Sequence, residues 1–216
     1  MQNLINDLTK ILLEGDWFKA EDWLEKTKSL GYSPIEIQED IIKASMYNLG
    51  RFWEKNIISV ADEHLATITA DFLLTRLQPA PAPAAPKPLA MLFCIEGEEH
   101  YIGLKMSASI LRANGWEVKM LGSNLPIDHA VYFARKWKPE LVGMSISIST
   151  LLPNLLKCEE KIRALPHQPM TLIGGRLVSL YNLESHIDKK TILVSDLYDL
   201  ERWAADFSKE EAIKQI

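Results

Sequence analysis

The sequence predicts an α/β protein in which a helical half precedes a half built on a parallel sheet. Three observations support this. Over the first 77 residues, apolar side chains recur at the spacing of amphipathic helices. From residue 89 onward, short apolar runs alternate with helical segments. Residues 78–88 between them are rich in proline and alanine, which favours an extended linker. We therefore expect three segments, 1–77, 78–88 and 89–216.

Four helices are expected in the N-terminal half. Apolar residues recur every three or four positions from Leu4 to Leu12, and Gly15 ends that helix. Ser33 and Ser59 each begin a further helix, because a serine followed three residues later by a carboxylate is typical of a capping box. The four helices begin near Leu4, Trp17, Ser33 and Ser59, and the last ends near Leu77. Short connections between four helices predict a bundle.

Five strands are expected in the C-terminal half. They are Leu89–Cys94, Glu117–Leu121, Leu141–Ser145, Met170–Ile173 and Ile192–Val194. Helical segments near residues 100–113, 127–136, 152–165 and 199–212 separate them. This alternation predicts a parallel sheet with helices on both faces. In such folds ligands bind at the carboxyl ends of the strands, so the residues that follow each strand are the candidate site.

Composition excludes several classes of function. The net charge is −5 and lysine and arginine are not clustered, so we do not expect direct binding to nucleic acid. No apolar stretch reaches the roughly 18 residues needed to span a bilayer, and the N-terminus has no signal-peptide pattern. Two cysteines give no disulfide framework and suit a reducing cytoplasm, which is the expected location.

The loop after the first expected strand contains Glu98-x-His100-x-x-Gly103. A histidine in such a loop can bind a metal, and a nearby carboxylate can accept its other ring N–H and raise its basicity. Gly103 would let a bulky group approach the helix closely. The pattern alone leaves an alternative open, an exposed acidic turn with a histidine at a helix start.

Two further motifs follow the third and fourth strands. Ser145-Ile146-Ser147 ends the third strand, and capping of the strand end is its alternative interpretation. Gly174-Gly175 follows the fourth strand and permits close approach of another group, although a glycine pair is weak evidence by itself.

In the helical half, Trp53 is followed by nine residues and then by Glu63-His64. A tryptophan near a helix end is most often core packing, and a Glu-His pair is most often a solvated helical face.

Together, and in their order along the chain, the four motifs resemble those of the cobalamin-binding photoreceptors and antirepressors that sense light with adenosylcobalamin. The resemblance implies a four-helix cap followed by a Rossmann-like (flavodoxin-like) domain with a five-stranded parallel sheet. It also implies that adenosylcobalamin, or another cobalamin form, is held with its cobalt between the two. Relatives more often have aspartate where Glu98 stands and leucine where Ser147 stands.

The resemblance also implies a role for each residue. His100 would be the lower axial ligand of cobalt, displacing the cofactor's own dimethylbenzimidazole, and Glu98 would orient it. The slot for the displaced base and the buried nucleotide tail would be lined by Gly103, Ser145, Ser147, Gly174 and Gly175. The upper ligand would be contacted by Trp53, Glu63 and His64.

By the same resemblance the protein is not an enzyme but a light sensor that regulates transcription through a protein partner. The helical half begins almost at residue 1, so we expect no DNA-binding domain before it. One alternative is a corrinoid carrier protein of a methyltransferase system. Another is a cobalamin storage or delivery protein. The Trp-x9-Glu-His pattern distinguishes the sensor, because a carrier does not need it.

Overall fold

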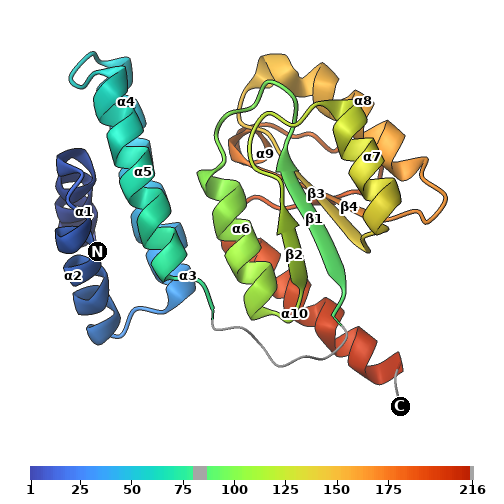
Figure 1. Cartoon of the computed structure of the whole chain (residues 1–216), viewed down its shortest axis with the longest axis horizontal. Helices are drawn as coiled ribbons and strands as arrows, with labels where there is room; N and C mark the ends of the chain where they lie inside the picture. Colours follow the sequence, from blue (N-terminus) through green and yellow to red (C-terminus); the bar gives the residue numbers. More distant parts are fainter. Residues whose placement is uncertain (80–86, 215–216) are drawn as a thin grey trace. The chain divides into compact units, whose positions relative to one another are not determined.

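The computed structural model describes residues 1–79 and 87–214, in two compact units, Met1–Gln78 and Pro79–Ile216 (Figure 1). Most of the expected linker, residues 78–88, lies outside the described residues. Each unit is described by itself below.

The first unit is helical, as its apolar periodicity predicts. Its elements are α1 (Gln2–Glu14), α2 (Trp17–Ser29), α3 (Pro34–Glu36), the π-helical segment η1 (Ile37–Ile42), α4 (Lys43–Glu54) and α5 (Val60–Arg76). Because α3, η1 and α4 follow one another without a break, they correspond to the single third helix expected from the sequence. The π-helical stretch in its middle was not predicted, since a hydrophobic pattern does not distinguish it from an α-helix. Helix α1 packs against α2, α4 and α5.

Both expected capping boxes are present. The Ser33 hydroxyl accepts a hydrogen bond from the backbone N–H of Glu36, and the Glu36 carboxylate accepts one from the Ser33 N–H. Ser59 and Asp62 make the same reciprocal pair at the start of α5. Both carboxyls have a pKa below their ordinary value, and the hydrogen bond from the serine hydroxyl is the main cause. These pairs fix where α3 and α5 begin.

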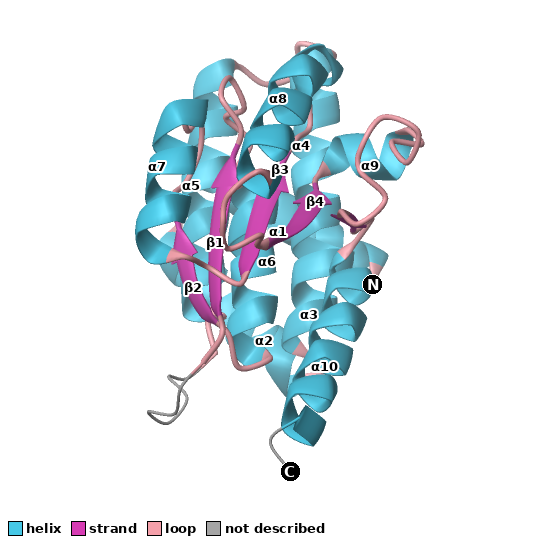
Figure 2. Ribbon diagram, turned by 90° about the vertical axis from the view of Figure 1, so that its right-hand side faces the viewer, coloured by secondary structure: helices cyan, strands magenta, loops and turns pink. Residues whose placement is uncertain are grey.

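The second unit is a five-stranded parallel sheet, within the described residues, with helices on both faces (Figure 2). The strands are β1 (Leu89–Cys94), β2 (Glu117–Met120), β3 (Leu141–Ser145), β4 (Met170–Gly174) and β5 (Ile192–Leu193). Their order is β2-β1-β3-β4-β5, and every pairing is parallel. The order reverses at β1, so the crevice beside the carboxyl ends of β1 and β3 is the expected place for a ligand.

Two layers of helices cover the sheet. The helices are α6 (Ile102–Ala113), α7 (Ile127–Trp137), the 3-10 turn η2 (Ser149–Leu151), α8 (Leu152–Arg163), α9 (Arg176–Leu180) and α10 (Leu197–Lys214). Helices α6 and α10 pack against each other, as do α7 and α8, and the two pairs lie on opposite faces of the sheet (Figure 1). The sequence did not predict α9, because five residues are too short to show a period.

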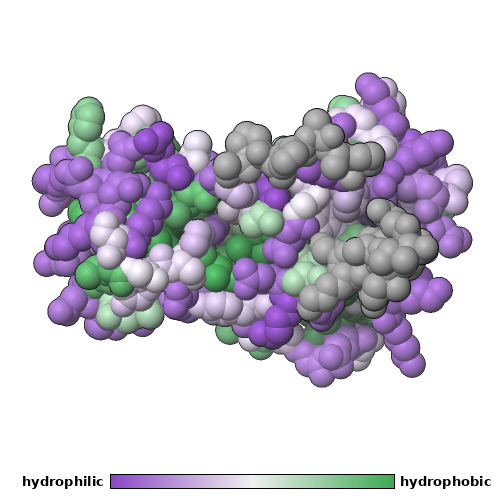
Figure 3. All heavy atoms as spheres, turned by 90° about the horizontal axis from the view of Figure 1, so that it is seen from below, coloured by the Kyte–Doolittle hydropathy of each residue, from purple (hydrophilic) through white to green (hydrophobic). Residues whose placement is uncertain are grey.

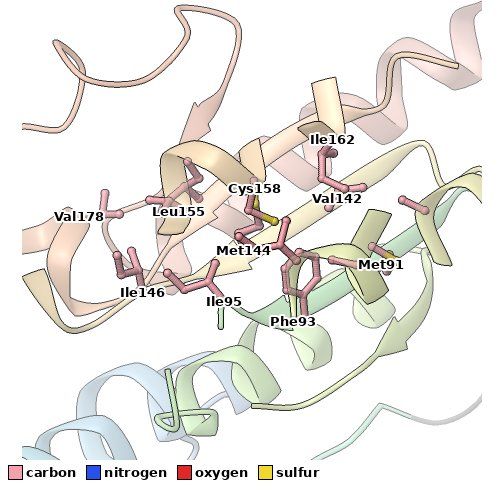
Figure 4. Packing of buried hydrophobic residues seen from close by; sticks show 14 of the residues in the cluster. Met91, Phe93, Ile95, Val142, Met144, Ile146, Leu155, Cys158, Ile162 and Val178 are labelled. Atoms are coloured by element: carbon pink, nitrogen blue, oxygen red, sulfur yellow. The ribbon is translucent and has the colours of Figure 1, made fainter. Parts of the chain in front are cut away.

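Apolar side chains fill both sides of the sheet. Under α7 and α8, fully buried residues such as Phe93, Met144 and Ile162 form one continuous cluster (Figure 4). On the α6 and α10 side, Trp116 is 2% exposed and its ring stacks on Trp203 at a centroid distance of 5.8 Å.

In contrast to the apolar core, the surface is mostly polar on the face shown in Figure 3, with apolar side chains exposed only in parts of it. Of the helices in residues 1–79 and 87–214, none combines the length and the apolar character that crossing a membrane requires.

Candidate functional site

The register of the sheet brings three of the expected motifs to one edge. Cys94 at the end of β1 pairs with Ser145 at the end of β3, and Ser145 pairs with Gly174 at the end of β4. The residues that follow these strand ends therefore emerge side by side. Residues 98–100 and Ser147 are joined directly by a hydrogen bond, so the loops after β1 and β3 form one structure.

Glu98 and His100 form the centre of this edge. The Glu98 side chain is fully buried. Its Oε1 accepts hydrogen bonds from the backbone N–H of His100 at 2.9 Å and from the His100 ring at Nδ1, at 2.5 Å. Its Oε2 accepts the backbone N–H of Ser147, at 2.5 Å. One buried carboxylate thus orients the histidine and ties it to the segment that follows β3.

The protonation state of this pair follows from its contacts. Burial opposes ionisation of Glu98, but the hydrogen bonds from His100 and Ser147 outweigh it and hold the pKa of the carboxyl below its ordinary value. An ionised carboxylate only accepts hydrogen bonds, so the proton of a neutral imidazole lies on Nδ1. The lone pair is then on Nε2 of a ring that is 66% exposed. This tautomer leaves Nε2 available to a metal, while Nδ1 is held by the carboxylate.

The thiol of Cys94 lies beneath the same loop. It is buried and donates a long hydrogen bond to the His100 carbonyl, with sulfur and oxygen 3.6 Å apart. Burial, reinforced by the charge of Glu98, raises the pKa of the thiol to about 12. The thiol is therefore neutral at physiological pH.

The two serines contribute in different ways. Ser145 is 6% exposed, and it pairs with Cys94 at the end of β1. Ser147 is held by its backbone N–H, which donates to Glu98.

The three site glycines differ in why they are glycine. Gly175 has a φ of 107°, and a Cβ there would lie 2.3 Å from the carbonyl oxygen of Ile146. The fold itself therefore requires it. At Gly174 a Cβ would lie 3.1 Å from Cγ2 of Val194, a tight contact with a side chain. At Gly103, in the first turn of α6, a Cβ would meet nothing within 4 Å. The protein does not require Gly103, which leaves open space where a bulky cofactor could approach.

The helical unit carries the remaining candidates. Trp53, near the end of α4, is 51% exposed, so core packing does not explain it. Glu63 and His64 lie at the start of α5, with carboxylate and ring 3.8 Å apart. The Glu63 carboxylate also accepts a hydrogen bond from the Thr67 hydroxyl at 2.8 Å, whereas the His64 side chain is 71% exposed.

Sequence reasoning missed Asn124 and Glu96, which hold the loop after β1. Asn124 bonds to three consecutive residues of that loop. The Glu96 carboxylate accepts the N–H of Ile127 at 3.3 Å, and its carbonyl accepts a hydrogen bond from the Asn154 amide at 3.1 Å. The only signal for Asn124 is its place in a Gly-x-Asn-x-Pro turn, where asparagine tolerates a left-handed backbone.

Comparison with protein families matches both units. A family model described as B12 binding domain covers residues 88–189, and a second model of the same description covers residues 4–78. The protein thus has two B12-binding domains, one helical and one with a Rossmann-like sheet, and cobalamin is the cofactor they bind.

Two curated relatives differ in what their names say. Trimethylamine corrinoid protein 2 of Methanosarcina acetivorans is 27% identical over 176 residues, which cover 78% of this chain and 80% of the relative. The HTH-type transcriptional repressor CarH of Myxococcus xanthus is 28% identical over 143 residues, which cover 66% of this chain and 48% of the repressor.

Solved structures share the fold. The monomethylamine corrinoid protein of Methanosarcina barkeri superposes with a TM-score of 0.75 at 19% identity, covering 95% of this chain and 99% of that one. A chain of the methanol:cobalamin methyltransferase complex MtaBC of the same organism gives a TM-score of 0.50 at 19% identity, covering 96% of this chain and 80% of that one. The predicted fold class, a helical region followed by a five-stranded parallel sheet with flanking helices, is confirmed.

Proposed function

We propose that this protein is a corrinoid carrier of a methyltransferase system, with His100 as the protein ligand of the cobalt. The observation that carries the proposal is the similarity to a trimethylamine corrinoid protein over about four fifths of both chains, including both units. Bound cobalamin supplies a metal centre on which a methyl group can be carried. A carrier of this kind is not itself an enzyme, because a separate methyltransferase catalyses the transfer.

The chain's own residues have three tasks in this proposal. Glu98 holds the His100 ring in one tautomer and one orientation, so Nε2 would be available to the cobalt without a search through rotamers. The open space at Gly103 would hold the displaced nucleotide tail, together with Ser145 and the glycine pair at the end of β4. The exposed helical residues Trp53 and His64 would contact the upper ligand.

The partner is expected to be a protein. A solved relative of the same fold is part of a complex named for a methanol:cobalamin methyltransferase. For this chain the corresponding partner would be a methyltransferase acting on a small methylated compound.

A light sensor remains the second candidate, and one observation favours it. The spacing of Trp53 and Glu63-His64 matches the pattern of the photoreceptors that the sequence resembles, and the repressor CarH is among the relatives. The sensor would act on a transcription regulator. The broader similarity to corrinoid proteins makes the carrier the better supported function.

One experiment separates the two candidates. The affinities of the purified protein for hydroxocobalamin, methylcobalamin and adenosylcobalamin are measured in the dark and after green light. A carrier is expected to bind the three forms within about threefold and to keep its oligomeric state on illumination. Preference for adenosylcobalamin by more than tenfold, with a change in oligomeric state in the light, would replace the carrier by the sensor.

A further inference from the structure

The loop that carries His100 is held from both sides. It follows β1, which lies between β2 and β3 in the sheet. From the β3 side, the backbone N–H of Ser147 binds the Glu98 carboxylate. From the β2 side, the contacts come from Asn124, in the connection that leads to α7.

Asn124 reaches three consecutive residues of this loop. Its side-chain Oδ1 accepts the backbone N–H of Gly97 at 2.8 Å, and its Nδ2 donates to Oε1 of Glu99 at 2.9 Å. Its backbone N–H donates to the carbonyl of Glu98 at 2.8 Å. The three residues that Asn124 contacts lie immediately before His100. One of them, Glu98, supplies the carboxylate that orients the imidazole.

Asparagine is well suited to this position. Its φ of 52° is left-handed, which asparagine tolerates better than most residues. Its short amide offers both an acceptor and a donor. Aspartate would keep the acceptor for Gly97 but would lose the donor and set a second carboxylate against Glu99. Glycine would keep the backbone conformation and lose both contacts.

We propose that Asn124 is a positioning residue for the axial histidine, acting through the backbone of residues 97–99. The inference rests on the proposed role of His100 as the cobalt ligand. By holding the loop, Asn124 limits the freedom of the imidazole before the cofactor arrives, and less ordering is then needed when the nitrogen–cobalt bond forms. Removing a direct hydrogen-bond partner of a metal ligand typically weakens the site by ten- to a hundredfold, and Asn124 acts one contact further out, so we expect an effect at the lower end of that range.

The test measures ligation directly. The protein is prepared with ¹⁵N-labelled histidine and loaded with cob(II)alamin, and paramagnetic resonance is recorded. A histidine nitrogen on cobalt gives a doublet superhyperfine splitting, whereas the unlabelled dimethylbenzimidazole nitrogen gives a triplet. The fraction of histidine-ligated cobalt is compared between wild type, Asn124→Gly and Asn124→Asp.

Asn114→Ala is the matched control. Asn114 is in the same unit, and its amide donates to the Ile110 carbonyl at 3.0 Å at the C-terminal end of α6, away from the strand ends. Both Asn124 variants are expected to lower the ratio of histidine-ligated to dimethylbenzimidazole-ligated cobalt roughly tenfold, and the control is expected to leave it unchanged. Amide hydrogen exchange without cofactor is expected to quicken at residues 97–100 in the Asn124 variants alone.

Two failures are distinguishable. If wild type shows the histidine doublet and both Asn124 variants keep its ratio within twofold, Asn124 does not position the ligand and this inference is overturned alone. If wild type shows only the triplet, the proposed function is overturned and this inference with it.

Discussion

The two units present their candidate residues in different ways. In the α/β unit, Glu98 is buried and bonded across 49 residues of sequence to Ser147, so its side chain has one position. In the helical unit, Trp53 and His64 are exposed, and Glu63 bonds to Thr67 one turn away in the same helix. Long-range contacts fix the first set, whereas local helical contacts hold the second. The geometry of the proposed cobalt ligand is therefore built in advance, whereas the exposed helical residues keep the freedom to adapt to whatever they contact.

If this contrast is right, the largest effect should come from a residue on which the strand ends depend. Gly175→Ala is expected to lower the free energy of unfolding by about 3 kcal/mol, because φ is left-handed and the new Cβ would overlap the Ile146 carbonyl oxygen. Urea unfolding of the cofactor-free protein measures it.

Gly103→Ala is the control for that prediction. Its Cβ meets nothing within 4 Å, and alanine is favoured over glycine in a helix by up to about 1 kcal/mol, so stability should hold or rise. Cobalamin affinity should nevertheless fall, because the methyl group occupies space assigned to the cofactor. An unchanged affinity would remove Gly103 from the site.

The next largest effect is expected at the ligand itself. His100→Ala should abolish the histidine splitting in the cob(II)alamin spectrum and weaken cobalamin binding by roughly a hundredfold, at least as much as loss of an outer contact. His186→Ala, which removes an exposed histidine bonded only locally to Ser185, should change neither. Retention of a histidine doublet in His100→Ala would move the ligand elsewhere.

His100 and Gly175 also show how much could be predicted from the sequence alone. The alternation of strands and helices predicted the sheet, and five of five strand positions agree with the structure to within about one residue at each end. The motif Glu98-x-His100 was recognisable because its spacing within one loop is local. The contacts of Asn124 were not recognisable, because Asn124 lies 26 positions from Glu98 and the two become neighbours only through the β2-β1 pairing. The reason for glycine at 175 was likewise hidden until the close approach to Ile146 was known.

A smaller effect is expected where the carboxylate joins the two loops. In Glu98→Gln an NH₂ group replaces one carboxylate oxygen, which accepts a hydrogen bond either from the Ser147 N–H or from the His100 ring. Two donors would then face each other in a buried place. The free energy of unfolding should fall by about 2 kcal/mol. Glu99→Gln is the matched control, since Glu99 is exposed, and it should cost less than about 0.5 kcal/mol. Thermal unfolding of both variants would test the difference, and equal losses would mean that the buried bridge carries no special stability.

The smallest effect is expected at Trp53, and it tests whether the helical unit is adaptable or specific. An exposed indole that covers an upper ligand by apolar contact gains energy from area and not from one fixed geometry. In a carrier, Trp53→Ala should therefore weaken adenosylcobalamin and hydroxocobalamin by similar factors, about threefold each. Trp17→Ala removes a tryptophan of similar exposure, 48%, that is already stacked on Phe72 at 4.9 Å, and it should leave both affinities unchanged. A loss of tenfold or more for adenosylcobalamin alone would mean that Trp53 reads the upper ligand. The helical unit would then be as specific as the α/β unit, and the light sensor would become the better description of the protein.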